Sequence, residues 1–165
     1  MDDKMEYEAF VQRACGKKSD FEASLKQMKR MPDQQVDKLF HAAHQSAFAT
    51  IDCLTCAFCC TYVGPRITLP DIRRISKALR LREADFERTY LKIDEDGDFV
   101  FRSMPCPFLL PDKKCLIYDD RPKACREYPH TDRKKMKQLF KLTLTNSACC
   151  PAVEHVLDEL GSKCK

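Results

Sequence analysis

The chain has 165 residues, of which 44% are hydrophobic and 33% are charged, and its formal net charge is +4. A chain of this length can bury an apolar core, and so small a net charge argues against a nucleic-acid partner. The sequence has no run of about 18 apolar residues, so it predicts no transmembrane helix and no membrane partner. The acidic beginning MDDKMEYEAF lacks the apolar stretch of a secretory signal, and we therefore expect a cytoplasmic protein.

The first 31 residues are charged and weakly periodic. The apolar side chains that fit one helical face are Phe10, Phe21, Leu25 and Met28. Gly16 interrupts this pattern. We expect residues 1–31 to form a helical N-terminal extension, and residues 32–165 to form a single cysteine-cluster metal-binding domain.

Later segments carry the spacing and the end signals of helices. In residues 32–51, apolar positions recur every three or four residues. In TLPDIRRISKALRL, Thr68 or a neighbour caps a helix that has Pro70 in its first turn, and EADFERTYLK follows as a short helix. The tail CPAVEHVLDELG is amphipathic, with Pro151 near its start and Gly161 as its stop.

Turn signals between these helices indicate small hairpins. Asp96 and Gly97 form a turn dipeptide, after which Phe99 and Phe101 alternate with polar neighbours. The segment CPFLLPDKKCLIY places two apolar runs around a second turn. Both segments therefore predict short antiparallel pairs.

The region that follows is mixed. DDRPKACREYP reads as a helical turn that Asp119 or Asp120 caps and that Pro129 ends. HTDRKKMKQLFKLTLT is basic at first and then strand-like. The sum is an α+β fold: a mainly helical small domain with short β-hairpins.

Cysteine is the outlier in the composition, with 11 of 165 residues. A secreted disulfide framework would explain many cysteines in a short chain. However, the number is odd, no export signal is visible, and four thiols crowd into eight residues, where cross-linking gains little. In a reducing compartment such crowding indicates metal. We therefore favour metal ligation over disulfides, and disulfides over eleven unrelated core cysteines.

The candidate ligands fall into two groups. The stretch IDCLTCAFCCT contains Cys53, Cys56, Cys59 and Cys60. A second group lies at turns and at the ends of elements, namely Cys106, Cys115, Cys125 and Cys150. Cysteines that are buried only as small apolar residues would instead follow a helical or strand face. The eight candidates make two sets of four, organised around one or more metal sites.

Two kinds of metal centre use four thiolates. Structural zinc takes four tetrahedral ligands, often with a C-x2-C pair. A four-iron, four-sulfur cluster uses C-x2-C-x2-C and a cysteine that precedes proline. The first part of that pattern matches Cys53, Cys56 and Cys59, whereas the C-P pairs at Cys106 and Cys150 are remote.

The adjacent pair Cys59 and Cys60 raises a separate question. Neighbouring side chains diverge by roughly 100° in a helix. We therefore expect the pair to serve two neighbouring metal sites, or one extended polynuclear site. Arg66, Arg121 and Arg126 are candidate partners for negatively charged sulfur, and His130 is the histidine best placed to join them.

The ordered blocks CLTCAFCC, CPFL, CLIYDDRPKACREYP and a CP before the C-terminal helix resemble the YkgJ-type cysteine-cluster family. Its members are described as zinc- or iron-chelating proteins with the signature CxxCxxCC. The resemblance implies that the binding residues are Cys53, Cys56, Cys59, Cys60, Cys106, Cys115, Cys125 and Cys150. The family usually has one cysteine before the last proline, whereas Cys149 adds a second here. Cys15 and Cys164 lie outside the motif.

The resemblance leaves two functional classes open. In the first, an iron–sulfur cluster gives the protein a redox or group-transfer role. The three-cysteine spacing favours this class, as does a similar domain in the longer flagellin lysine N-methylases, where methyl transfer is tied to a metal cluster. In the second, zinc stabilises a non-catalytic binding or adaptor module with a protein partner. Metal sensing or buffering is a third class. A closed four-thiolate site argues against hydrolytic zinc catalysis.

Overall fold

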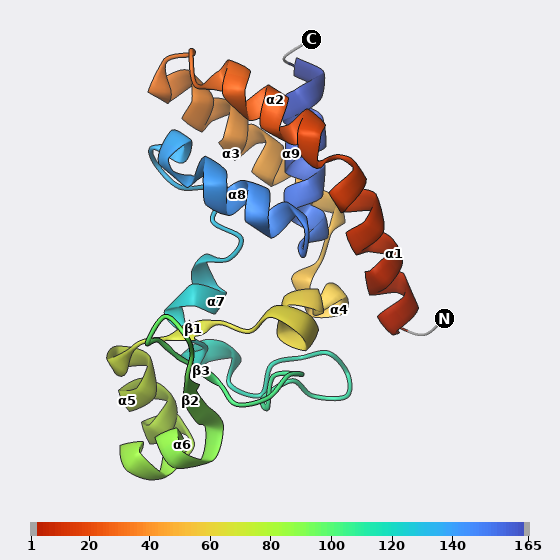
Figure 1. Ribbon diagram of the computed structural model, residues 1–165. Coiled ribbons are helices and arrows are strands. Elements are labelled where there is room, and N and C mark those ends of the chain that lie inside the picture. Colours follow the sequence, from red (N-terminus) through yellow and green to blue (C-terminus); the bar gives the residue numbers. More distant parts are fainter. Residues whose placement is uncertain (1–2, 164–165) are drawn as a thin grey trace. The chain divides into compact units, whose positions relative to one another are not determined.

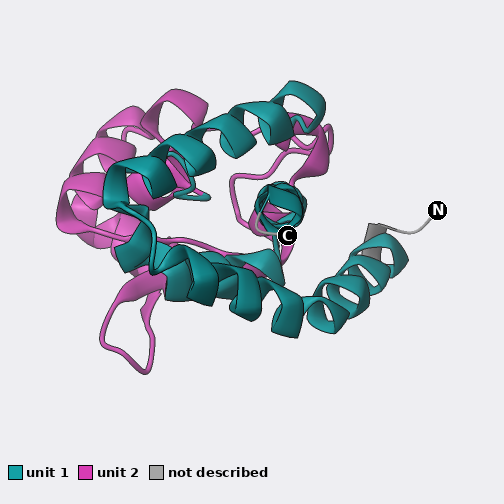
Figure 2. Ribbon diagram, turned by 90° about the horizontal axis from the view of Figure 1, so that it is seen from above, with its two compact units in different colours: residues 1–52, 129–165 teal, residues 53–128 magenta. Residues whose placement is uncertain are grey.

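The computed structural model describes residues 3–163 and divides the chain into two compact units (Figures 1 and 2). Unit 1 comprises residues 1–52 and 129–165, and unit 2 comprises residues 53–128. The chain is 64% helical and has one small antiparallel sheet, which confirms the predicted α+β class. The predicted boundary at residue 31 stays a prediction, and unit 1 includes residues on both sides of this position.

Unit 1 is built from helices. They are α1 (Asp3–Gly16), α2 (Lys18–Met28), α3 (Asp33–Thr50), the 3-10 turn η3 (Met136–Leu139), α8 (Phe140–Ser147) and α9 (Pro151–Lys163). Helix α3 packs most extensively against α9, which α2 and α8 also contact (Figure 1). The core side chains with at most 1% exposure include Met28, Val36, Phe40, Val153, Val156 and Leu157. The helical spacing predicted for residues 32–51 is confirmed.

The N-terminal segment joins this core through both apolar and ionic contacts. Its four predicted apolar residues are all buried, and the helix is interrupted at Gly16 as expected. On α9, the buried Glu154 accepts hydrogen bonds from Arg13 Nε and Nη2 at 3.0 and 2.9 Å. Its carboxylate also lies 3.1 Å from Lys17 Nζ. These contacts fix the end of α1 and the start of α2 against α9.

Two sequence expectations in unit 1 are wrong. The segment predicted to be strand-like is helix α8, in which Phe140, Thr143 and Ser147 are buried at helical spacing. The alternation of leucine and threonine imitates a strand, but packing within unit 1 decides the outcome. Gly161 does not end the last helix, which continues to Lys163. A β-carbon at this glycine would lie 3.2 Å from Ser24 Oγ, so Gly161 permits close packing with α2.

Unit 2 combines short helices with the sheet. Its elements are α4 (Cys53–Cys56), the π-helix η1 (Cys59–Val63), β1 (Arg66–Ile67), α5 (Leu69–Ala78), α6 (Glu83–Tyr90), β2 (Leu91–Ile93), β3 (Phe99–Phe101), the 3-10 turn η2 (Tyr118–Asp120) and α7 (Lys123–Glu127). The strand order is β1-β3-β2, with both pairs antiparallel. The predicted hairpin is confirmed: Asp94 Oδ1 accepts the N–H groups of Asp96 and Asp98 in its turn, and Gly97 has a φ of 81°. A short bridge between Leu109 and Cys115 forms the second predicted pair.

The apolar core of unit 2 centres on aromatic rings. The ring of Phe108 lies 5.0 Å from that of Tyr90, 5.6 Å from Phe101 and 6.3 Å from Phe86, measured between centroids. Cys106 and Cys115 pack against this cluster. The core therefore places two of the candidate ligands at its edge. None of the helices within the described residues combines the length and the apolar character that a membrane span requires.

Candidate metal centre

The CxxCxxCC segment is anchored by two of the apolar residues inside it. Ala57 and Phe58 are buried, whereas Cys53 is exposed and Cys56, Cys59 and Cys60 are half-buried. The chain turns from α4 into η1 at Ala57, whose φ of 52° lies in the left-handed region. The anchored segment therefore leaves its thiols at the surface of unit 2 or just beneath it.

Four thiols from separate segments of unit 2 gather within electrostatic reach of one another. They are Cys60 on η1, Cys106 and Cys115 at turns, and Cys125 on α7. The N–H of Cys106 donates a hydrogen bond to the carbonyl of Cys60 at 2.7 Å, which joins the first two segments directly. Charge on Cys60 raises the pKa of the other three thiols, and charge on Cys106 and Cys115 raises that of Cys125. The fold thus collects these four thiols from a span of 66 residues.

The surroundings of these thiols oppose negative charge. Burial raises the pKa of Cys106 to about 11 and that of Cys125 to about 12, and it also raises the pKa of Cys115. The positive charge of Arg121 acts in the opposite direction on Cys115 and Cys125. A bound cation stabilises thiolates in such surroundings, because its own charge dominates the local field. The all-sulfur donor set therefore fits zinc or an iron–sulfur cluster.

As the side chains stand, no three His, Cys, Asp or Glu residues among those the structure describes are arranged to hold a metal ion. Coordination by the four thiols of unit 2 therefore requires their side chains to turn toward a common point. All four are only half-buried and lie in turns or short helices, where such a change of rotamer disturbs little packing.

The adjacent pair does not diverge as expected. The sulfur atoms of Cys59 and Cys60 lie 4.0 Å apart, and this contact lowers the pKa of Cys60 to about 7 against the opposing effect of burial. The edge of a tetrahedral zinc–sulfur site with bonds of about 2.3 Å is about 3.8 Å. The pair is therefore compatible with one shared ion as well as with two neighbouring sites, and the two-site expectation stays a prediction.

The remaining cysteines lie elsewhere. Cys150 is buried in unit 1, where its N–H donates to Asn146 O at 2.9 Å just before α9. Its role as an eighth ligand stays a prediction, as does that of Cys53, Cys56 and Cys59. Cys149 Sγ donates to the same carbonyl at 3.4 Å. Cys15 is exposed on α1, Cys164 lies outside the described residues, and none of the cysteines within residues 3–163 forms a disulfide.

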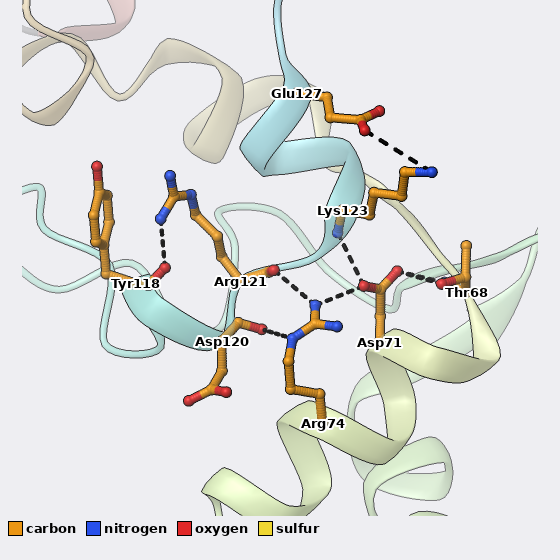
Figure 3. Close-up of polar contacts among 8 residues, drawn as sticks. All are labelled: Thr68, Asp71, Arg74, Tyr118, Asp120, Arg121, Lys123 and Glu127. Carbon is orange, nitrogen blue, oxygen red and sulfur yellow. Dashed lines mark hydrogen bonds and ion pairs between the residues drawn. The ribbon is translucent and has the colours of Figure 1, made fainter.

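The charged and aromatic candidates are distributed unevenly. Arg66 forms an ion pair with Asp98 at 2.9 Å, on the sheet. Arg121 is held beside the thiols by Tyr118: its Nη1 donates to the Tyr118 carbonyl at 2.6 Å, and its Cζ lies 3.9 Å from the centre of the ring (Figure 3). Arg121 is therefore the arginine that the structure connects with the thiols. His130 has a φ of 65° in unit 1, and a ligand role for it stays a prediction.

Sequence reasoning missed one polar group that bears on the site. Asp71 on α5 accepts the N–H of Lys123, the first residue of α7, at 2.9 Å (Figure 3). The expected cap by Asp119 or Asp120 is therefore wrong, because the carboxylate that caps α7 comes from another helix. The T-x-x-D pattern from Thr68 signals the local capping box of α5. The same pattern does not indicate that Asp71 also accepts a hydrogen bond from Lys123, 52 residues away.

A comparison with known families finds a match that covers the candidate cysteines. The model described as "CxxCxxCC: Putative zinc- or iron-chelating domain" matches residues 52–151, which make up more than half of the chain. The matched range contains all eight candidate cysteines. No solved structure matches the chain.

Proposed function

Because the chain belongs to the CxxCxxCC family of zinc- or iron-chelating domains, we propose that its thiols hold an iron–sulfur centre. One ligand set is Cys60, Cys106, Cys115 and Cys125. The observation that supports this set is that four distant segments of unit 2 bring their thiols within electrostatic reach. The sequence pattern adds the remaining proposed ligands, Cys53, Cys56, Cys59 and Cys150.

The chemistry that such a centre supplies is electron transfer, or support of a group transfer. The protein's own residues bind the cluster and surround it with apolar side chains and with the charge of Arg121. Ligation by reduced thiols also requires a reducing compartment. On that ground we propose a cytoplasmic location, with a redox or group-transfer partner protein.

Zinc is the second candidate, and a specific feature of unit 2 favours it. Cys106, Cys115 and Cys125 lie at turns or on a five-residue helix, where regular backbone pairing is sparse. A structural zinc ion commonly ties such segments together, and its binding free energy then becomes folding free energy. In this case the protein is a metal-stabilised binding or adaptor module.

Metal and acid-labile sulfide analysis of the anaerobically purified chain, with its visible spectrum, separates the two candidates. Iron with sulfide and an absorbance near ~400 nm supports the iron–sulfur centre. A colourless protein that contains zinc and no sulfide supports the second candidate. A wild-type chain that retains neither metal overturns both.

Single substitutions test the ligand assignment. Cys60→Ser and Cys125→Ser should each lower the metal content, because a thiolate ligand is lost. Cys15→Ser is the matched control, since its thiol is exposed on α1. Equal metal content in all three variants would contradict the assignment.

A further inference from the structure

The side chain of Asp71 is completely buried, yet it carries a charge. Burial by itself raises the pKa of this carboxyl, but hydrogen bonds from Thr68, Arg74 and the Lys123 N–H outweigh that effect and hold the pKa below its usual value. A buried carboxylate is costly unless its oxygen atoms are fully hydrogen-bonded. The two oxygens of Asp71 meet that condition in different ways.

The first oxygen acts locally. Oδ2 accepts the N–H of Thr68 at 3.0 Å and the Thr68 hydroxyl at 2.6 Å, which completes the capping box at the start of α5. Any helix with this pattern can make these contacts. They account for half of the polar environment of the carboxylate and do not require a second segment of the chain.

The second oxygen reaches the segment that carries the ligands. Oδ1 accepts the Lys123 N–H at 2.9 Å and Arg74 Nη2 at 2.6 Å. The same Nη2 of Arg74 donates to the carbonyl of Arg121 at 2.9 Å, and its Nε lies 3.3 Å from that of Asp120 (Figure 3). We refer to Asp71, Arg74 and these backbone groups of residues 120–123 as the clamp.

The clamp supplies the N-terminal cap that α7 lacks in its own segment. This helix has five residues, and no side chain of its own segment caps it at Pro122. A helix of this length is not stable in isolation, and a carboxylate at its first N–H both completes a hydrogen bond and interacts favourably with the helix dipole. Cys125 is the third residue of α7. Its thiol therefore stays within electrostatic reach of the other three only while the helix stays in place.

We propose that Asp71 and Arg74 are positioning residues that hold Cys125 in register with Cys60, Cys106 and Cys115. The expected consequence is tighter metal binding, because the fourth ligand is preorganised. This consequence rests on the proposed function. The positioning itself is a property of the metal-free chain.

Alkylation of the reduced, metal-free full chain measures that positioning at each cysteine, with peptide mass spectrometry as the readout. In Asp71→Asn, the rate at Cys125 should rise roughly tenfold or more, because one charge-assisted contact to the helix is lost. Thr68→Val is the matched control, since it removes the hydroxyl bond to Oδ2 and leaves Oδ1 with its partners. The rate at Cys125 in this control should match the wild type.

Selectivity separates positioning from general loss of stability. Equal increases at Cys60, Cys106 and Cys125, an equal increase in Thr68→Val, or no increase at all would overturn the proposal. Arg74→Lys gives a second route if Asp71→Asn does not fold: the cation remains, but it cannot reach both the carboxylate and the two carbonyls. A smaller increase confined to Cys125 supports the proposal, and none contradicts it.

Zinc titration with a competing chelator tests the consequence. Asp71→Asn should weaken Zn²⁺ binding by roughly tenfold or more relative to wild type and Thr68→Val, because the fourth ligand must be ordered on binding. A wild-type chain that binds neither zinc nor iron refutes the proposed function, while the alkylation rates still decide the clamp. Unchanged zinc affinity in a variant with selectively exposed Cys125 would overturn the claim of preorganisation.

Discussion

The two units of this chain are built on different physical principles. In unit 1, helices of up to 18 residues bury continuous apolar faces, and α3 and α9 supply fully buried side chains such as Phe40 and Val156. In unit 2, strands of two or three residues and two helices of ten and eight residues share one smaller core that centres on aromatic rings. Seven of the eight candidate cysteines belong to unit 2.

This difference separates packing from cross-linking as sources of order. Long amphipathic helices gain most of their stability from tertiary packing, and unit 1 has such packing. Short elements gain less, so unit 2 depends more on contacts that join distant segments, such as Asp71 with Lys123 and the proposed ligation of a metal by its thiols. The comparison predicts that each unit responds to a different perturbation.

Removing the metal should have the largest effect, and that effect should be concentrated in unit 2, which holds seven of the eight candidate ligands. Structural zinc contributes apparent binding free energies of about 10–16 kcal/mol in small domains, which is comparable with the whole stability of a typical fold. Under reducing conditions and a strong chelator, hydrogen exchange should therefore accelerate in residues 53–128, but not to the rates of an unfolded segment, because the core around Phe108 and the contact of Asp71 with Lys123 do not depend on the metal. The amides of α3 and α9 should keep their protection. Equal loss in both units would break the comparison.

A core truncation in unit 1 is the reciprocal perturbation. Phe40 is fully buried, and its ring stacks on that of Phe140 with centroids 5.7 Å apart. Phe40→Ala should lower the free energy of unfolding by about 3–5 kcal/mol, as measured by denaturant titration. The metal content per folded chain should not change. Leu142→Ala, at a position that is 40% exposed on α8, is the control and should stay within about 0.5 kcal/mol.

The fold was predictable where local signals and packing agree. Thr68 and Pro70 mark the start of α5, and Asp96 with Gly97 marks the hairpin, because caps and turns depend on a few adjacent residues. Helix α8 was not predictable, since its leucines and threonines alternate as in a strand. Its conformation depends on neighbours that are distant in sequence.

The same distinction applies to the site. Spacing predicted the CxxCxxCC segment as a metal site, because metal ligation imposes short, recognisable intervals. The other candidate cysteines were predicted from their position at turns and at the ends of elements. It could not group Cys60 with Cys106, Cys115 and Cys125, since that grouping depends on how unit 2 folds. Nor could it find the contact of Asp71 with α7, which joins residues 52 positions apart.

Glu154 offers a smaller perturbation of unit 1, with a pH signature. Burial raises the pKa of this carboxyl, but the hydrogen bonds and charges of Arg13 and Lys17 outweigh burial and lower the pKa below its usual value. A group whose pKa is lower in the folded state contributes stability above its unfolded pKa of about 4.3. That contribution is lost as the pH falls through the folded pKa.

Glu154→Gln should therefore cost about 1–3 kcal/mol at pH 7, because charged hydrogen bonds are lost at a buried group. It should also flatten the fall in unfolding free energy between pH 5 and pH 3, at roughly the pH of carboxyl titration. Denaturant titrations across this range measure both effects. Glu22→Gln, on the exposed side of α2, should reproduce the wild-type profile. A wild-type slope in Glu154→Gln would show that the ion pairs contribute nothing.

The smallest effect is expected for Gly161→Ala, which tests how closely α9 packs against α2 in unit 1. Gly161 lies inside α9, where alanine is favoured over glycine by about 1 kcal/mol in a helix. The added β-carbon would lie 3.2 Å from Ser24 Oγ, a hydroxyl that donates to the Asp20 carbonyl at 3.0 Å. Gly161→Ala should therefore be nearly neutral, because the gain in helix propensity is offset by this close contact. Adding Ser24→Ala removes the hydroxyl, so the higher helix propensity of alanine at position 161 should then increase the free energy of unfolding.

A double-mutant cycle measures this compensation directly. The variant with both substitutions should be more stable than Ser24→Ala alone by up to about 1 kcal/mol, whereas Gly161→Ala on the wild-type background should gain less. Strictly additive effects would show that the contact with Ser24 does not limit residue 161. Packing against α2 would then not explain the glycine at position 161. Close packing of α2 on α9 would also no longer distinguish unit 1 from unit 2, whose segments pair over only a few residues.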